Sequence, residues 1–323
     1  MDWSNMFSTF ILATLVSQSI VPLHTYNGIS NGIVVQVELP EGEDIGHLVL
    51  RNYDGQQLSN PTPVTKGTHN LVARVPEIKN IKSAVWIELL IGGEPVGESL
   101  VVQPLASRDV PVVEEAFRPD GKATYTKIVG WKNEAEEDGV EGRFISGWRV
   151  YVAKDILIET DRGNIRVAMR PDVAPNTVWN FCELAAGGLY QNTTFHRIVP
   201  LSSKGHPFLI QGGDPTGTGI GGAGSWLPIE NSSLKHEFGV ISMARAGDPD
   251  SAGCQFFLCL SREGTARLDG QYCSFGETVN GKEVINLIAE VPLRDPSTGE
   301  PMNPPQIHSI TLIPKKQPSL ESD

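Results

Sequence analysis

The sequence lacks an excess of positive charge. Its 323 residues include 26 lysines and arginines against 38 aspartates and glutamates, which gives a formal net charge of -12. Both halves of the chain are acidic, so neither offers the basic surface that a nucleic-acid backbone requires. A negative charge of this kind is typical of a soluble protein. We therefore expect no nucleic-acid partner.

Cysteine is scarce, and its spacing matches no ligand pattern. The four cysteines all lie in the second half, at Cys182, Cys254, Cys259 and Cys273. They form neither the paired pattern of a zinc site nor a CxxC redox motif. The four cysteines could form two disulfides or remain as small buried thiols, and burial as thiols is the favoured interpretation. We expect no metal and no cofactor.

The motifs of several enzyme classes are also missing. The chain contains no GxSxG elbow, no HExxH pair and no Walker loop, which argues against hydrolases, metalloproteases and NTPases. Residues 217–222 (GTGIGG) formally match GxGxxG. A dinucleotide site needs a helix directly after that motif, and Pro228 in a glycine-rich stretch argues against one. We interpret the segment as a shaped turn.

A hydrophobic run long enough to cross a bilayer as a helix is missing too. Residues 6–16 are apolar and resemble the hydrophobic part of a secretory signal, although no lysine or arginine precedes them. Export, for example to a periplasm, and retention in the cytoplasm both stay open. We assign residues 1–25 to an apolar leader and expect no membrane span.

Short strand patterns follow the leader. Runs such as residues 33–37 and 85–91 are rich in β-branched and aromatic side chains and end at glycine or proline. They predict a small antiparallel β-sandwich over residues 26–104, of unknown role. Residues 105–147 contain an acidic, glycine-containing run and are interpreted as a connector.

A second domain is expected at residues 148–316, with a short tail at 317–323. Pro175 predicts the start of one helix, and a second helix is expected at about residues 282–290. The inward-facing side chains of the second helix are expected to be Val284, Leu287 and Ile288. Many short strands and glycine-rich loops lie between the two helices.

Five short motifs in this region are the most informative feature of the chain. They are FHR at 195–197, QGGD at 211–214, SMARA at 242–246, QFF at 255–257 and LDG at 268–270. In this order and spacing they resemble the cyclophilin family of peptidyl-prolyl cis/trans isomerases, in its bacterial-type form, over about residues 155–314. The resemblance implies a mainly β fold, a closed antiparallel barrel of eight strands capped by two helices. It also implies an enzyme that accelerates rotation about Xaa–Pro bonds in protein folding.

The resemblance assigns roles to individual residues. Arg197 would stabilise the twisted amide, Gln211 would orient the peptide and support Arg197, and Phe208 would line the slot for the proline ring. His196 is expected to be structural. Further substrate-binding residues are expected at Leu209, Ala244, Arg245, Gln255, Phe257, Leu268 and Tyr272. The partners would be proline-containing peptides and unfolded protein clients.

Some positions depart from the pattern of the family. Arg267 stands where many members have a tryptophan that contacts cyclosporin, so tight binding of that drug is in doubt. Tyr272 replaces a common pocket histidine, and Arg245 replaces a common asparagine. Residues 201–207 form a longer loop than usual, with the composition of a solvent loop. A second hypothesis therefore stays open, a proline-peptide binding module with little catalysis.

Overall fold

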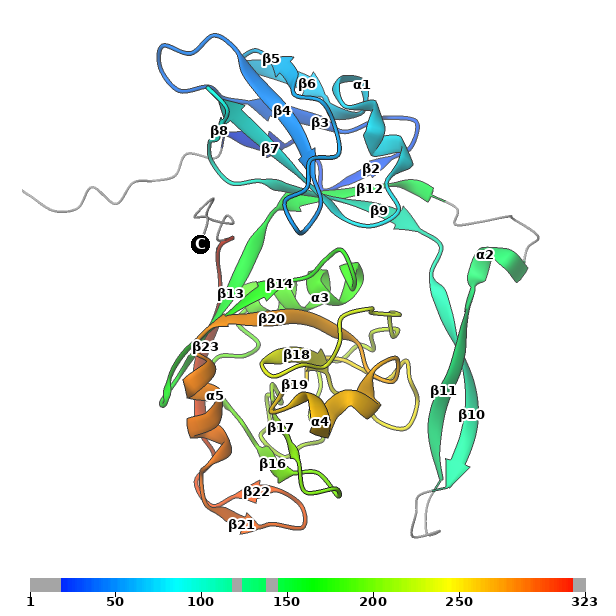
Figure 1. Cartoon of the computed structure of the whole chain (residues 1–323), viewed down its shortest axis with the longest axis vertical. Helices are drawn as coiled ribbons and strands as arrows, with labels where there is room; N and C mark the ends of the chain where they lie inside the picture. The colour runs from blue at the N-terminus through cyan, green and yellow to red at the C-terminus, as the bar shows by residue number, and fades with distance from the viewer. Residues whose placement is uncertain (1–18, 118–123, 138–144, 316–323) are drawn as a thin grey trace, which may run out of the picture.

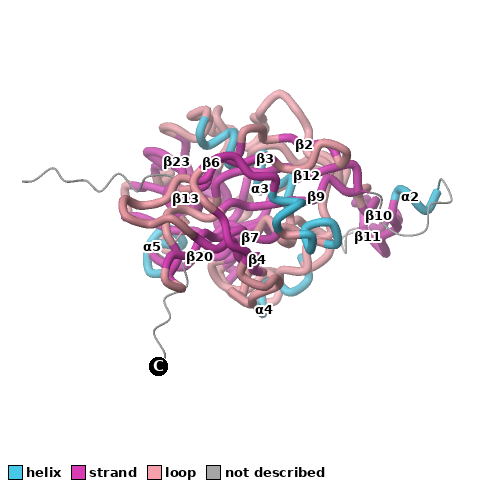
Figure 2. Tube along the Cα trace, turned by 90° about the horizontal axis from the view of Figure 1, so that it is seen from above, coloured by secondary structure: helices cyan, strands magenta, loops and turns pink. Residues whose placement is uncertain are grey.

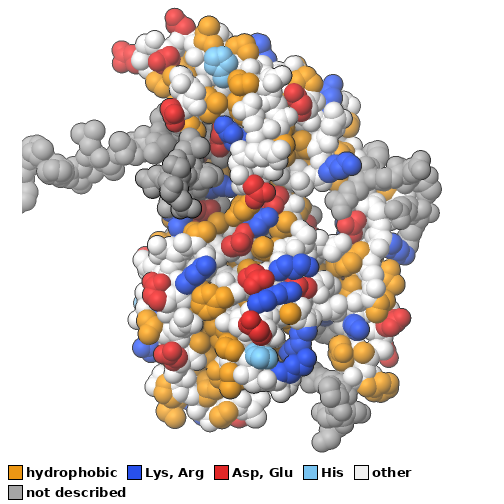
Figure 3. Space-filling model, in the orientation of Figure 1, with side chains coloured by type: hydrophobic (Ala, Val, Ile, Leu, Met, Phe, Trp, Pro, Cys, Tyr) orange, Lys and Arg blue, Asp and Glu red, His pale blue; other side chains and the backbone are white. Residues whose placement is uncertain are grey.

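The computed structural model describes residues 19–117, 124–137 and 145–315. Within them, strands dominate and build two units, one above the other in Figure 1, with a two-stranded hairpin at one side (Figure 2). None of the described helices is long and apolar enough to span a bilayer. On the face seen in Figure 3, basic and acidic side chains are interspersed over the lower unit.

The N-terminal unit consists of two sheets packed over one apolar core. The smaller sheet has the order β1 (Ile20–Pro22), β3 (Val34–Val37) and β6 (Gly67–Asn70). The larger sheet has the order β2 (Tyr26–Gly28), β12 (Ile145–Val152), β9 (Leu100–Ala106), β7 (Val85–Ile91), β4 (Gly46–Arg51) and β5 (Thr62–Val64), with β8 (Glu94–Pro95) beside β7. Two short helical turns, α1 (Leu71–Arg74) and η1 (Pro76–Asn80), follow β6. Buried side chains of both sheets form one cluster, so this unit is the sandwich that the strand pattern predicted.

The sandwich extends beyond the residues assigned to it from the sequence. Ile20 belongs to the segment assigned to the leader, but it is fully buried in the sandwich core, and β1 pairs with β3. Likewise, β12 pairs with β9 and β2, and its Trp148 and Val150 enter the same core. Only Ala153 separates β12 from β13. The strand pattern therefore has no break where the chain passes from one unit to the other.

The segment interpreted as a connector has regular structure of its own. β10 (Asp109–Phe117) and β11 (Thr124–Asn133) form an antiparallel hairpin, and α2 (Glu134–Glu137) follows. The hairpin packs against the second unit, because Ile128 and Trp131 of β11 contact the hydrophobic core of that unit.

The second unit is built around a nine-stranded sheet in which every pair is antiparallel. Its order is β15 (Thr193–Thr194), β23 (Gln306–Pro314), β13 (Lys154–Thr160), β14 (Gly163–Met169), β20 (Ser274–Asn280), β18 (Val240–Met243), β19 (Phe256–Cys259), β17 (Pro207–Gly212) and β16 (Arg197–Leu201). The two end strands, β15 and β16, are consecutive in the chain and are separated only by Phe195 and His196. The sheet thus returns to the stretch of chain where it starts, which is consistent with the expected barrel, although it has nine strands where eight were expected.

Two helices contribute to the interior of the barrel. α3 (Pro175–Ala186) buries Val178, Phe181 and Ala185, and α5 (Lys282–Ala289) buries Val284, Ile285 and Ile288. Leu287 is 51% exposed, which corrects the expectation that it faces inward; Ile285 takes that place on the buried face. The remaining elements are α4 (Arg262–Thr265), η2 (Ala266–Leu268), β21 (Leu293–Asp295) and β22 (Glu300–Pro301). All four cysteines are free thiols, as favoured from the sequence.

Candidate active site

Strand register places three of the expected site residues in one row on the outside of the barrel. Arg197 on β16 is paired with Gln211 on β17, and Gln211 is paired with Phe257 on β19. The next residues along these strands include Ile198 and Ile210, which are fully buried in the barrel core. Because successive side chains of a strand point to opposite faces, the row faces outward.

An apolar cluster separate from the barrel core lies next to this row. Its buried members are Phe208, Leu209, Val240, Phe257, Cys259 and Leu268, and its partly buried members are Val199, Leu234, Ala244 and Tyr272. The structure therefore brings Phe208, expected to line the proline slot, together with expected substrate-binding residues, namely Leu209, Phe257, Leu268, Tyr272 and Ala244. Val240 and Cys259 were not anticipated, because apolar residues in a strand carry no mark of which face they occupy.

Hydrogen bonds hold Arg197 through a chain of side chains. Its Nη1 donates to Gln211 Oε1 at 3.2 Å, and Gln211 Nε2 donates to Gln255 Oε1 at 2.9 Å. Gln255 Nε2 in turn donates to the carbonyl oxygens of Gly221 at 2.8 Å and Gly219 at 3.1 Å. Each carboxamide is thus used at both ends, which fixes its orientation.

A second contact to Arg197 comes from far along the chain. Arg197 Nε donates to the carbonyl oxygen of Thr298 at 3.2 Å, in the turn between β21 and β22. The amide of Ile198 also donates to the carbonyl of Gly299 at 2.7 Å. Gly299 has a φ of +81°, and a Cβ there would lie 2.5 Å from Ile198 O, so only glycine fits this close approach. No local pattern in the sequence pointed to this support.

The glycine-rich loop at residues 217–222 wraps around a carboxylate of the protein itself. Asp214 is fully buried and accepts hydrogen bonds from the amides of Thr216, Gly219 and Gly221 at 2.7, 2.6 and 3.1 Å. Burial alone would raise the pKa of Asp214, but these hydrogen bonds hold it below its ordinary value. The loop is the shaped turn expected from the sequence, and it presents the carbonyls that orient Gln255.

Arg197 keeps its positive charge unneutralised. Thirteen ion pairs join lysine, arginine or histidine to carboxylates among the described residues, for example Arg170 and Asp172 at 2.8 Å, and none of them includes Arg197. A guanidinium stays charged at any pH at which proteins fold. The arrangement can therefore place a cationic donor beside an apolar surface.

Tyr272 and Arg245 border the apolar cluster beside Phe257. The ring of Tyr272 meets Phe257 edge to face, with centroids 5.7 Å apart. The guanidinium of Arg245 lies 4.8 Å from the centre of the Tyr272 ring, and its Nε donates to Gln271 O at 3.0 Å. Arg245 is therefore folded back onto the protein at this border.

Arg267 and the loop at residues 201–207 border the cluster at Phe208. The Arg267 guanidinium lies 4.7 Å from the centre of the Phe208 ring, a cation–π contact. Leu201 pairs with Pro207 across the β16–β17 hairpin, and Leu201 is 56% exposed. The segment is the solvent-facing loop that its composition predicted.

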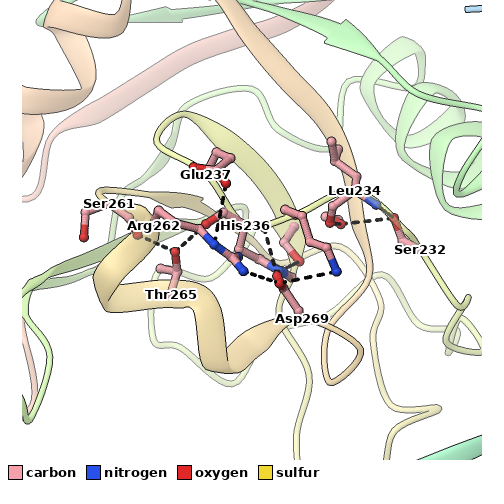
Figure 4. A network of polar contacts seen from close by, with 11 residues as sticks. Ser232, Leu234, His236, Glu237, Ser261, Arg262, Thr265 and Asp269 are labelled. Atoms are coloured by element: carbon pink, nitrogen blue, oxygen red, sulfur yellow. Dashed lines mark hydrogen bonds and ion pairs between the residues drawn. The ribbon is translucent and has the colours of Figure 1, made fainter.

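Behind Phe257 lies a buried network that has the residue types of a catalytic triad (Figure 4). His236 Nδ1 lies 3.0 Å from Asp269 Oδ1, and its Nε2 lies 3.0 Å from Ser242 Oγ. His236 and Ser242 are both fully buried, so the hydroxyl cannot meet a substrate. The imidazole instead stacks on Phe257 with centroids 6.0 Å apart and an interplanar angle of 13°.

The protonation state of this network follows from its burial. Burial lowers the pKa of His236, although Asp269 acts in the opposite direction. The neutral ring donates from Nδ1 to Asp269 and accepts from the Ser242 hydroxyl at Nε2. Arg262 Nη2 holds the other oxygen of Asp269 at 2.7 Å. The network is a rigid support for the floor of the apolar cluster, which sequence reasoning did not anticipate.

His196, next to Arg197, makes no polar contact of this kind. Both of its ring nitrogens are buried and form no well-oriented hydrogen bond among the described residues, although Gln255 and the Thr194 backbone lie close enough to oppose the effect of burial on its pKa. Burial lowers its pKa, so the ring is neutral near pH 7, which agrees with a packing role.

Comparison with known proteins identifies the family of this region. Residues 155–312 match the family described as "Cyclophilin type peptidyl-prolyl cis-trans isomerase/CLD". A peptidyl-prolyl cis-trans isomerase of Arabidopsis thaliana is 40% identical over 167 residues, which cover 50% of this chain and 92% of that protein. A peptidyl-prolyl cis-trans isomerase-like 2 protein of Cryptococcus neoformans is 39% identical over 163 residues, 48% of this chain and 27% of that protein. The chain thus spans about a quarter of the length of this fungal relative.

A solved structure is similar over the same part of the chain. It is the crystal structure of a cyclophilin type isomerase of Cryptosporidium parvum in the presence of the dipeptide Ala-Pro. It is 33% identical, covers 49% of this chain and 98% of its own, and has a TM-score of 0.44. The bacterial-type assignment stays a prediction. On the match to residues 155–312 and the near-complete coverage of the plant relative, the chain belongs to the cyclophilin-type peptidyl-prolyl cis-trans isomerases.

Proposed function

We propose that the protein accelerates cis/trans rotation about Xaa–Pro bonds in peptides and unfolded protein clients. The observation that carries this proposal is the position of Arg197. Its unpaired guanidinium is held by Gln211 at the edge of the apolar cluster around Phe257. The activity named for the relatives is the same reaction.

The reaction needs no covalent chemistry. Amide resonance sets a rotation barrier of about 18–20 kcal/mol, so uncatalysed exchange takes roughly 10–100 s. At the top of the barrier the amide is twisted and the proline nitrogen is pyramidal, with a lone pair that the planar amide lacks. A fixed donor can hydrogen-bond to that lone pair only in the twisted state, and such binding lowers the barrier.

Arg197 would be this donor. Its Nε and Nη1 are occupied by Thr298 and Gln211, which fix the plane of the guanidinium, while a planar fork with five N–H groups keeps others available. Gln211 would orient the peptide as well, and Gln255 would hold Gln211 in place. Preorganisation of this kind avoids reorientation at the moment of reaction.

The proline ring would pack against the apolar cluster. Phe208, Leu209, Phe257 and Leu268 present apolar surface there, and Tyr272 adds a flat ring at right angles to Phe257. If the proline ring is held still, the acyl group before it can rotate about the Xaa–Pro bond, and the bond changes from one isomer to the other. The residues before the proline would run past Ala244 and Arg245.

One observation favours a second candidate, a module that binds proline peptides with little catalysis. The Arg267 guanidinium lies over Phe208 and would narrow the slot, which could slow turnover more than binding. Exchange spectroscopy on a short Xaa-Pro peptide separates the two candidates. An isomerase speeds cis/trans exchange at substoichiometric protein, whereas a binding module shifts peptide resonances on titration and leaves the exchange rate unchanged.

A further inference from the structure

A cavity of about 210 Å³ lies between the sandwich and the barrel. Its sandwich wall is the outer face of the larger sheet. Val85 and Ile87 on β7 enter the sandwich core, so Trp86 between them faces the other way. The barrel wall includes Trp179 and Cys182 of α3. The cavity is therefore the space that two independently packed units leave where they meet.

The walls of this cavity are largely apolar and aromatic. Trp86 and Ala153 are 3% and 2% exposed and form its deep part. Tyr151 meets Trp179 edge to face, with centroids 5.0 Å apart. Glu183 is exposed to solvent and lies at the mouth. Walls of this kind suit a flat apolar molecule.

Two donors on these walls have no partner among the described residues. Trp86 Nε1 and Tyr151 Oη are both buried and both lack a hydrogen bond. The indole N–H can only donate, and a buried donor without an acceptor costs free energy. An occupant that carries hydrogen-bond acceptors would remove that cost.

The cavity also contains an ammonium group without a carboxylate. Lys315 Nζ lies 4.1 Å from the centre of a Trp86 ring and 4.8 Å from that of Tyr53, and the ion pairs of the described residues do not include it. Lys154, which also lines the cavity, is already paired with Glu98 at 2.6 Å. Burial lowers the pKa of Lys315, and the more distant carboxylates of Asp155, Asp172 and Glu88 oppose this shift without overcoming it.

We propose that this cavity is a binding site for a small aromatic carboxylic acid. The ring would lie between Trp86 and Trp179, and the carboxylate would accept hydrogen bonds from Lys315 and from the unpaired donors. An apolar cavity of about 150 Å³ can hold benzene, so this one has room for a benzene ring with a short acidic chain. Because both units line the site, its occupant would also hold the sandwich against the barrel.

Calorimetric titration of the full chain with phenylacetate tests this site, with the neutral phenylacetamide as its matched control. We expect saturable binding of one phenylacetate per chain, with phenylacetamide about tenfold weaker because it lacks the charge-assisted hydrogen bond. Lys315→Met should abolish that preference, whereas Lys282→Met, at an exposed position of α5, should not. Ala153→Leu fills the deep part and should remove binding of both compounds. Cys182→Leu serves the same purpose from the barrel wall if Ala153→Leu fails to fold.

Four results would overturn the proposal. Failure of phenylacetate to saturate at millimolar concentration would mean that the cavity holds only water. Unchanged binding in both filled variants would place the site elsewhere, and competition by an Xaa-Pro peptide would place it in the apolar cluster. Equal affinity for the two compounds, with no effect of Lys315→Met, would exclude the carboxylate. The isomerase rate of wild-type protein is measured in parallel, and its outcome is independent of all four.

Discussion

The carboxamide of Gln271 forms two hydrogen bonds with the backbone of Ile128. Its Oε1 accepts from the Ile128 amide at 3.0 Å, and its Nε2 donates to the Ile128 carbonyl at 2.8 Å. The β10–β11 hairpin is thereby fastened to the barrel one residue from Tyr272. A second attachment lies at the base of the hairpin, where Arg108 pairs with Asp250 at 3.1 Å.

Removing the Gln271 carboxamide should loosen the hairpin. Gln271→Ala leaves the amide and carbonyl of Ile128, which is 5% exposed, without their partners. Unsatisfied buried groups cost about 1–3 kcal/mol. We expect a loss of that size in the free energy of unfolding, measured with urea, whereas the exposed control Gln191→Ala should change it little. Equal stability of the two variants would mean that the hairpin is not held at this point.

Gln211→Ala should slow isomerisation more than it weakens peptide binding. The substitution removes the acceptor that orients Arg197 Nη1, and a hydrogen bond to a charged group is worth about 1.5–3 kcal/mol. A fall in kcat/KM of roughly tenfold to a hundredfold is therefore expected, with the dissociation constant of an Xaa-Pro peptide changed only a few fold. A variant that loses peptide affinity and retains its turnover rate would contradict the positioning role of Gln211.

Acid should destabilise the network behind Phe257. His236 has a folded-state pKa below its unfolded value of about 6.5, so the unfolded chain binds the proton more readily. This contribution to stability is complete above about pH 6.5 and is lost as the pH falls below it. The urea midpoint of wild-type protein should therefore decrease from pH 7 to pH 5.5.

Two substitutions isolate the contribution of His236 to this pH dependence. His236→Gln removes the titrating ring and should flatten the slope over this range, although His196, whose pKa is also lowered, leaves a residual slope. His206→Gln, at an exposed position of the β16–β17 loop, should keep the wild-type slope. An unchanged slope in His236→Gln would show that the buried imidazole does not control acid stability.

Arg267 should govern binding of cyclosporin. The resemblance to the family places Arg267 where many members have a tryptophan that contacts the drug, and its guanidinium lies over the Phe208 ring. We expect weak inhibition of wild-type protein and at least tenfold tighter inhibition of Arg267→Trp, a gain of about 1.4 kcal/mol or more. Arg162→Trp, at an exposed turn of the barrel, is the matched control. Tight inhibition of wild-type protein would mean that the arginine leaves the drug site intact.

Features encoded by short motifs and by periodicity were predictable from the sequence. The helix that starts at Pro175 and the strand-rich sandwich follow from local side-chain patterns. Arg197, Phe257 and Leu268 are far apart in the chain. They could be assigned to one site only from the resemblance to the family, because local patterns do not predict the barrel that brings them together.

Contacts set by tertiary packing could not be predicted. Thr298 supports Arg197 although the two residues are 101 positions apart in the sequence. The β10–β11 hairpin, which contacts the barrel, comes before β12 in the chain, and yet β12 belongs to the sandwich. Both depend on how completed units dock, and no local pattern encodes that. The same is true of the cavity at Trp86 and Lys315, which exists only where the two units meet.

The most direct test of the central claim is the cis-to-trans rate of a short Xaa-Pro peptide with wild-type protein and with Arg197→Ala, each checked for an unchanged thermal midpoint. Wild-type protein should accelerate exchange strongly, and the variant should lose about a hundredfold or more in kcat/KM, the cost of removing one preorganised donor. Peptide binding should stay within a few fold, because the apolar cluster is intact. Acceleration that persists at the wild-type level in Arg197→Ala would contradict the mechanism, and no acceleration by either protein would contradict the assignment as an active isomerase.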